Sequence, residues 1–360
     1  MSYTINWTKT DDYLEGNTKN FKLTNKLAMF DLDHTLVAPV KGKIFSVDSD
    51  DWKFLHNNVP NKIKELTKND YSIIIMSNQK CISKGTQNAQ EWMDKINNIV
   101  NKLKCDIFVF CSTDDNKFRK PSPCFFNEKI LTQNKNIDYS KSFYCGDAAG
   151  REKDFSDTDY KFALNCKLTF MVPEQLFLEE NITLPQIEYI DFNNLKKNKM
   201  IKFVPNKKKE MIIMVGLQGS GKSSLSKHIS EKYGYEIVNQ DTLKTKAKCV
   251  KKVTELVTQN KSFIVDCTNP SKEARKEWIA LIDKDIYDVR VILMTTPKEI
   301  CMHNNTYRAY TTDAKFVPEI AYRMYKSKFK EPELSEGFSE IIKTDMCGVP
   351  TDEKYYMYLY

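Results

Sequence analysis

The sequence has 360 residues, a formal net charge of +7 and a hydrophobic fraction of 41%. This length can hold two domains, and this apolar content excludes a disordered chain. The modest positive charge allows a polyanionic partner without requiring one.

The sequence does not indicate secretion, membrane insertion, or a metal or disulfide scaffold. The N-terminus is polar and shows no signal peptide, and the longest apolar runs are only as long as a strand. Ten cysteines occur without a C-x-x-C pair, alongside four histidines, so neither a zinc site nor a disulfide framework is predicted. We expect free buried thiols and an intracellular protein, cytoplasmic or nuclear.

The first candidate catalytic pattern follows a short polar stretch. Residues 1–25 are polar and mixed, and we expect an extended lead-in there. An apolar strand at residues 27–30 runs into DLDHT at residues 31–35, at a strand end, where open α/β sheets place their chemistry. The spacing allows Asp31 to attack a phosphorus as nucleophile while Asp33 handles protons. Aspartates at strand ends also bind metals or cap helices, so this pattern alone is not specific.

Later strands of this half deliver other polar side chains. We predict a hairpin at residues 40–45 with Gly42 in its turn, a helix at 61–68, and strands at 71–76, 106–111, 142–145 and 168–172. Ser77 follows the first of these strands, Lys120 follows the second and Asp147 follows the third. With Asp31 and Asp33 they supply the nucleophile, hydroxyl donor, cation and Mg²⁺ ligand that phosphoryl transfer needs.

A change of composition separates this half from the next. Residues 181–209 mix proline, asparagine and lysine, and we interpret them as an inter-domain linker. The lysines between 196 and 209 fit a solvated segment better than a nucleic-acid contact, although charge runs serve as interaction segments in some proteins.

The second half opens on a phosphate-binding loop. A β-branched strand at 211–215 leads into GLQGSGKS at residues 216–223, which matches G-x-x-x-x-G-K-[ST], and a helix-forming run follows at 225–232. In such a loop Lys222 reaches the β- and γ-phosphates and Ser223 ligates Mg²⁺. The alternative is a chance glycine-rich turn, which the flanking strand and helix disfavour. The predicted ATP-binding residues are Gly216, Gly219, Ser220, Gly221, Lys222, Ser223 and Ser224.

Two further aspartates follow strands of this half. Strands are predicted at 235–238, 262–265 and 289–294. Asp241 follows the first, where it could accept the proton of an attacking hydroxyl, and Asp266 follows the second, near the phosphates or the metal. Capping of a helix is the alternative role for each.

The motifs of the first half resemble those of the haloacid-dehalogenase phosphatase superfamily, and more narrowly the polynucleotide kinase 3′-phosphatase family. The matching segments are DLDHTL (31–36), SDDWKFL (49–55), SNQ (77–79), FRKP (118–121), GDAAGR (146–151) and KDFSDTDYKFALN (153–165). The resemblance implies an aspartyl-phosphate on Asp31, a proton donor and later base at Asp33, and phosphoryl oxygens gripped by Ser77 and Lys120. Mg²⁺ would be held by Asp31, the Asp33 carbonyl and Asp147. The short intervals between the motifs leave no room for a large cap, which argues for a macromolecular substrate.

The resemblance continues into the second half. The matching segments there are VNQDTL (238–243), DCTNP (266–270), HNN (303–305) and LSEGF (334–338). In that family this half is a 5′-kinase. The resemblance implies that Asp241 is its general base and that Arg308 is a lid arginine engaging the donor phosphates.

Several positions depart from the family pattern. Nothing before Asp31 is long enough for the forkhead-associated domain of animal members. Gln240 and Lys248 stand where those members have arginine, Thr306 replaces another arginine, and His34 stands where glycine is usual. Without these arginine side chains, bidentate contacts with phosphates of the acceptor strand should be weaker. The preference for the acceptor strand is therefore expected to differ from that of animal members. Residues 355–360 are predicted as a terminal strand that packs in the core, with base stacking as the alternative.

We therefore predict a two-domain α/β chain with a lead-in at 1–25, an uncapped haloacid-dehalogenase-like phosphatase at 26–180, a linker at 181–209 and a P-loop kinase at 210–360. The predicted activity, with Mg²⁺ and ATP, is removal of 3′-phosphates and phosphorylation of 5′-hydroxyls at DNA breaks, as a monomer acting before a ligase. The alternatives are an RNA or tRNA end-repair enzyme of the same chemistry, or a chain with one active half and a second half that only binds.

Overall fold

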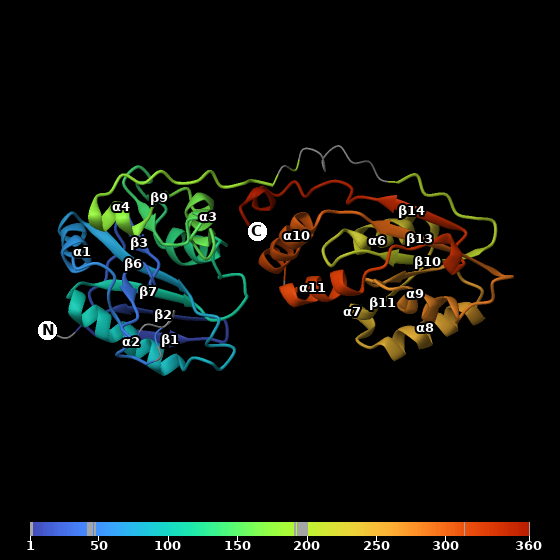
Figure 1. The fold of residues 1–360 in the computed structure, drawn as a ribbon, viewed down its shortest axis with the longest axis horizontal. Coiled ribbons are helices and arrows are strands. Elements are labelled where there is room, and N and C mark those ends of the chain that lie inside the picture. The colour runs from blue at the N-terminus through green and yellow to red at the C-terminus, as the bar shows by residue number, and fades with distance from the viewer. Residues whose placement is uncertain are drawn as a thin grey trace. The chain divides into compact units, whose positions relative to one another are not determined.

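The computed structural model describes residues 3–41, 46, 48–190, 192, 201–312 and 314–359 (Figure 1). The chain forms two compact units. The first contains Met1–Tyr189, Ala309–Asp313 and Met357–Leu359, and the second contains Ile190–Arg308 and Ala314–Tyr356. No helix within the described ranges combines the length and the apolar character that a membrane span needs.

The first unit is built on a seven-stranded sheet in the order β1-β2-β7-β6-β3-β8-β9. The strands from β7 to β9 pair in parallel, and β2 and β1 add an antiparallel hairpin at the β7 edge. The strands are β1 Ile5–Lys9, β2 Tyr13–Thr18, β3 Lys26–Phe30, β6 Tyr71–Asn78, β7 Ile107–Ser112, β8 Phe143–Cys145 and β9 Thr169–Met171.

Helices cover both faces of this sheet, so its central strands are apolar on both sides. In β3, Ala28 and Phe30 pack with α1, α2 and α4, while Leu27 and Met29 pack on the opposite face with α3 and the π-helix η1. The helices are α1 Val59–Lys68, α2 Ala89–Leu103, η1 Phe126–Leu131, α3 Thr158–Asn165 and α4 Pro173–Leu178. This alternation explains why the sequence shows continuous apolar runs here.

The structure corrects the predicted lead-in at residues 1–25, because β1 and β2 belong to the sheet. Strand β2 alternates, with Leu14, Gly16 and Thr18 buried between more exposed residues. A Cβ at Gly16 would lie 2.5 Å from Cγ2 of Ile5, so only glycine lets β1 approach this closely. The outward-facing residues of the hairpin are polar, and they hide the strand pattern in the sequence.

The predicted hairpin at residues 40–45 lies partly outside the described residues, since Gly42 and the three residues after it are not described. In this region β4 Val37–Ala38 pairs antiparallel with β5 Lys53–Phe54. Much of the predicted linker, residue 191 and residues 193–200, also lies outside the described part. Phe203, within the same predicted linker, is buried against Tyr233 and Tyr235 of the second unit.

The second unit is a five-stranded parallel sheet in the order β11-β12-β10-β13-β14. The strands are β10 Lys209–Val215, β11 Glu236–Asn239, β12 Phe263–Asp266, β13 Tyr287–Met294 and β14 Glu340–Thr344. The helices are α6 Lys222–Tyr233, α7 Gln240–Leu243, α8 Lys246–Thr258, α9 Lys272–Ile279, α10 Lys298–Thr311 and α11 Glu319–Lys328, with 3-10 turns η2 Leu334–Glu336 and η3 Glu353–Tyr356. Helix α6 packs on one face, while α8 and α9 pack on the other (Figure 1).

The predicted α/β architecture of two domains is confirmed, and the predicted strands other than the hairpin at 40–45 and the terminal strand are present within one or two residues. The predicted terminal strand at 355–360 is wrong for residues 355–359, and Tyr360 lies outside the described residues. Residues Glu353–Tyr356 form a 3-10 turn in which the side chain of Tyr355 is 1% exposed. Tyr355 packs edge-on against His303 and Tyr307 of α10, so this tyrosine is buried by contacts with a helix and not by pairing in a sheet.

Candidate active sites

The first unit gathers three aspartates where its strands end. Asp31 follows β3, Asp147 follows β8 and Asp159 lies in the first turn of α3. One carboxylate oxygen from each lies within 4.8 Å of the other two. Such an all-oxygen donor set suits a hard cation such as Mg²⁺.

Asp159 was not predicted as a site residue, although it lies in the segment 153–165 that carries part of the family resemblance. Its carboxylate lies so close to the backbone before Asp147 that a Cβ at Gly146 would be 2.4 Å from Asp159 Oδ2. The same oxygen accepts a hydrogen bond from the Ala148 amide at 3.1 Å. The glycine before Asp147 was the available signal, since it marks a place where another group must come close.

Lys120 is buried among these acids, with 3% of its surface exposed. Its Nζ donates to Asp31 Oδ1 at 2.6 Å, to Asp159 Oδ1 at 2.7 Å and to the Tyr144 hydroxyl at 2.7 Å. Burial opposes the charge of Lys120, but Asp159 and Asp31 outweigh it and raise the pKa of this lysine. The ammonium therefore stays charged and holds the Asp31 carboxylate in one orientation.

The carboxyl groups of this cluster have perturbed pKa values. Burial raises the pKa of Asp31 well above its usual range, with Lys120 acting in the opposite direction. Burial, reinforced by Asp159, raises the pKa of Asp147 to about 6. A divalent cation among the carboxylates would favour their ionised forms, so the donor set and its charge both fit Mg²⁺. Thr35 Oγ1 donates to Asp147 Oδ1 at 3.1 Å and orients that carboxylate.

Both oxygens of Asp33 are engaged by donors from other elements. Gln79 Nε2 donates to Asp33 Oδ2 at 2.7 Å and to Ser77 Oγ at 3.0 Å. Lys95 Nζ donates to Asp33 Oδ1 at 2.8 Å. The structure thus brings the predicted Asp33 and Ser77 into one network, and it adds Gln79 and Lys95, which were not predicted as site residues. A lysine on the apolar stripe of a helix was the signal for Lys95.

His34 adopts a left-handed backbone with φ of 58°. This conformation is disfavoured for residues with a side chain and is favoured for glycine. The His34 amide donates to the Val37 carbonyl at 2.7 Å and closes the turn that follows Asp33.

In the second unit the phosphate-binding loop joins β10 to α6. Gly219 and Gly221 have φ of 78° and 94°, in the region that favours glycine. A Cβ at Gly219 would lie 2.2 Å from the Cys301 carbonyl oxygen, so glycine also permits the close approach of α10. The loop therefore has the predicted strand–loop–helix context.

Lys222 is 8% exposed, and its Nζ donates to the carbonyl oxygens of Gly216 at 3.0 Å and Leu217 at 2.6 Å. Burial lowers the pKa of Lys222 to about 8, with Asp266 acting in the opposite direction. Asp266 Oδ2 accepts a hydrogen bond from Asn239 Nδ2 at 2.9 Å, whereas Asp266 Oδ1 is buried without a hydrogen-bond partner among the described residues. An unsatisfied buried carboxylate oxygen beside a buried lysine fits a site for a cation and a phosphate chain.

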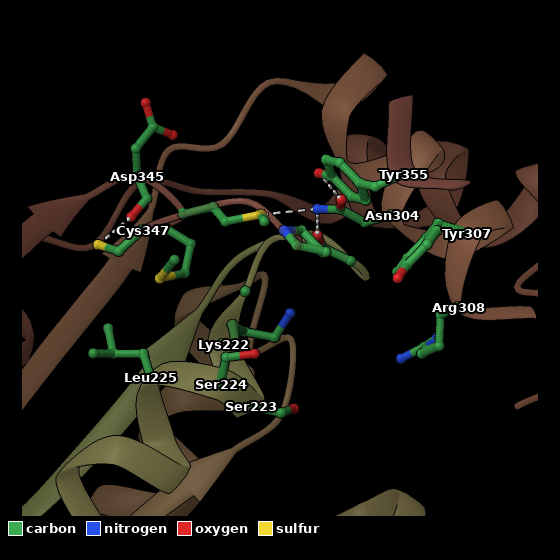
Figure 2. A pocket seen from close by; sticks show the side chains of 15 residues that line it. Lys222, Ser223, Ser224, Leu225, Asn304, Tyr307, Arg308, Asp345, Cys347 and Tyr355 are labelled. Atoms are coloured by element: carbon green, nitrogen blue, oxygen red, sulfur yellow. Dashed lines mark hydrogen bonds between the residues drawn. The ribbon is translucent and has the colours of Figure 1, made fainter. Parts of the chain in front are cut away.

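A cavity of about 240 Å³ opens beside this loop. Lys222 and Arg308 extend toward the same space from α6 and α10 (Figure 2). Asn304 of α10 fastens the loop, since its Nδ2 donates to the Gly219 carbonyl oxygen at 2.8 Å and its Oδ1 accepts from the Tyr355 hydroxyl. The cavity lining includes Gly219, Gly221, Lys222, Ser223, Ser224, Asn304, Tyr307, Arg308 and Asp345.

Asp241 does not line this cavity. It lies exposed in the first turn of α7, after β11, and its amide donates to Asn239 Oδ1 at 2.8 Å. Because Asn239 also bonds Asp266, one side chain links the two aspartates. Gln240 and Lys248 are exposed near Asp241 in the chain, and Thr306 Oγ1 donates within its own helix to the Met302 carbonyl at 3.2 Å.

Known proteins match both halves of the chain. The family model for Polynucleotide kinase 3 phosphatase matches residues 26–177, and an AAA domain model matches residues 211–252 and 245–332. The chain is 37% identical over 341 residues to the bifunctional polynucleotide phosphatase/kinase of Schizosaccharomyces pombe, covering 94% of this chain and 84% of that relative. It is 28% identical over 203 residues to the polynucleotide 3′-phosphatase of Saccharomyces cerevisiae, covering 41% of this chain and 85% of that protein.

Proposed function

Because the chain belongs to the bifunctional polynucleotide phosphatase/kinase family, we propose that it removes 3′-phosphates and adds 5′-phosphates at DNA strand breaks, leaving ends that a ligase can join. The observation that supports this proposal is that each unit carries its own set of phosphoryl-transfer groups. The acid cluster with Lys120 belongs to the first unit, and the phosphate-binding loop belongs to the second.

In the phosphatase, an oxygen of Asp31 attacks the phosphorus and the bond from phosphorus to the 3′-oxygen breaks. Asp33 donates a proton to the departing 3′-oxygen, and it then accepts a proton from the water that hydrolyses the aspartyl-phosphate. Ser77 and Lys120 bind the phosphoryl oxygens, while Asp31, Asp147 and the Asp33 carbonyl would hold Mg²⁺. A bound Mg²⁺ would supply neutralisation of the charge that develops on the phosphoryl group.

In the kinase, Lys222, Ser223 and the amides of the loop bind the phosphates of ATP, and Ser223 would also hold Mg²⁺. Arg308 reaches the donor phosphates from α10, on the opposite side of the cavity from Lys222. Asp241 accepts the proton of the 5′-hydroxyl. Since Asp241 lies outside the cavity lining, we place the acceptor strand on the β11 side of the sheet, next to α7.

The test is an assay of one purified sample on end-labelled oligonucleotides that carry a 3′-phosphate or a 5′-hydroxyl, with DNA and RNA in parallel. We expect both activities on DNA, each dependent on Mg²⁺, and ATP dependence for the kinase alone. Activity confined to RNA would contradict the proposed DNA substrate. Activity at only one kind of end would show that only one of the two units is catalytically active.

A further inference from the structure

Lys95 is a buried cation within the apolar stripe of α2. It lies among Trp92, Ile96 and Ile99, and only 2% of its surface is exposed. Placing a lysine there costs free energy unless its charge is paired, and an apolar residue would cover the core more simply. Helix packing therefore does not explain this residue.

The ammonium of Lys95 is directed at the phosphatase site. Its Nζ donates to Asp33 Oδ1 at 2.8 Å and to Ser46 Oγ at 2.8 Å. The other oxygen of Asp33 accepts from Gln79 at 2.7 Å. Two donors from different elements, α2 and the end of β6, thus hold the two oxygens of one carboxylate. Each oxygen keeps a second lone pair, which leaves room for a transferable proton.

We propose that Lys95 is a positioning residue that aims the Asp33 carboxyl at the departing 3′-oxygen. This inference rests on the proposed function, in which Asp33 transfers that proton. In this proposal Lys95 acts through Asp33 and does not contact the phosphoryl group, whereas Lys120 bonds Asp31 in the same site. Each aspartate of the D-x-D pair therefore has its own buried lysine.

The test compares two substrates whose leaving groups differ in their need for a proton. The alkoxide of a 3′-end leaves poorly without a proton, whereas p-nitrophenolate leaves without one. If the Asp33 carboxyl is not directed at the leaving oxygen, phosphoryl transfer from a 3′-phosphorylated oligonucleotide should slow much more than phosphoryl transfer from p-nitrophenyl phosphate. Rates of the first turnover should be compared, so that later hydrolysis of the aspartyl-phosphate does not enter.

Lys95→Met, which keeps chain length and suits an apolar helix face, should lower the first-turnover rate on the oligonucleotide about 100-fold, with KM little changed. The p-nitrophenolate burst should change by less than about threefold, since proton donation contributes little there. Lys95→Arg, which keeps a charged donor, should restore part of the lost rate. A matched control is Lys129→Met, because Lys129 pairs with Glu15 in the same unit but not with the site, and both rates should then stay unchanged.

Asp33→Asn separates the two levels of the proposal. If Asp33→Asn lowers the first-turnover rates on both substrates equally, Asp33 is not the proton donor and the proposed mechanism fails. If Asp33→Asn lowers mainly the rate on the oligonucleotide, but Lys95→Met lowers both rates equally or lowers neither, the positioning role of Lys95 is overturned. If Lys95→Met does not fold, Lys95→Gln takes its place, and an unchanged p-nitrophenolate burst then shows that the site is intact.

Discussion

Asp159 Oδ1 and Lys120 Nζ lie 2.7 Å apart, and each side chain is 3% exposed. This ion pair joins the first turn of α3 to the segment that follows β7. The same ammonium reaches Asp31 at 2.6 Å, so Asp159 holds the cation that holds the expected nucleophile. Removing one partner of such a pair leaves a buried charge, which makes this contact important for stability as well as for the reaction.

We predict that Asp159→Asn lowers the free energy of unfolding of the first unit by about 3 kcal/mol, at the low end for a broken buried pair because Asp31 still contacts Lys120. Urea unfolding measures this change. The control is Asp157→Asn at the N-cap of the same helix, where the bridge to Lys161 is more exposed and should contribute about 0.5 kcal/mol or less. Equal effects of the two variants would show that the buried pair has no special role.

The two active sites should be separable by mutation. Asp31→Asn removes the proposed nucleophile and should abolish 3′-phosphatase turnover while 5′-phosphorylation stays nearly intact. Lys222→Ala should do the reverse, since its ammonium lies in the phosphate-binding loop of the other unit. Both activities are measured on the same folded sample. Loss of both in either variant would contradict two independent sites.

Asp147→Asn should raise the Mg²⁺ concentration needed for half-maximal phosphatase activity about tenfold or more, because a neutral amide is a poorer ligand for a hard cation. Mg²⁺ titration of the phosphatase rate measures the effect, and the kinase titration of the same sample is the control. An unchanged midpoint and rate would remove Asp147 from the proposed ligands.

The double variant Gln240→Arg and Lys248→Arg should lower the KM for the polynucleotide acceptor and leave the KM for ATP unchanged. Both residues are exposed near Asp241 in the chain, and an arginine fork makes bidentate phosphate contacts that glutamine and lysine do not. Each added charge-assisted bond contributes about 1–3 kcal/mol. Acceptor KM across a salt series decides the matter, since identical values and slopes in both proteins would mean that neither position contacts phosphate.

His303 should make the second unit less stable in acid. Burial lowers the pKa of His303 to about 4. The hydrogen bond between its Nε2 and the Tyr355 carbonyl acts in the opposite direction. Between pH 6.5 and 4 the unfolded chain therefore binds a proton that the folded unit excludes, so stability falls as the pH falls. The expected slope is about 1.4 kcal/mol per pH unit within this window.

The comparison protein for this experiment is His303→Gln, which has no titrating group at that position. Urea unfolding at several pH values should show the wild-type stability falling toward acid more steeply than that of the variant. Parallel curves for the two proteins would mean that His303 is not buried in its neutral form.

The phosphate-binding loop and the D-x-D pair were predictable from the sequence because each is one contiguous segment. Strand, turn and helix signals surround residues 216–223, and the backbone of that segment itself forms the phosphate site. The same holds for Asp31 and Asp33 at the end of β3. Periodicity also predicted the parallel strands, since burial on both faces leaves continuous apolar runs in the sequence.

Only the tertiary structure determined which side chains pair with one another in the phosphatase site. Lys95 and Asp33 are 62 positions apart, and Lys120 and Asp159 are 39 apart, so no local pattern pairs them. They meet because α2 and α3 pack on opposite faces of one sheet and direct these side chains to the same edge. The β1–β2 hairpin and the turn at Tyr355 depend likewise on surfaces formed by distant residues. Local propensity determines which segments become strands and helices, but the contacts that complete a site form only when those segments pack.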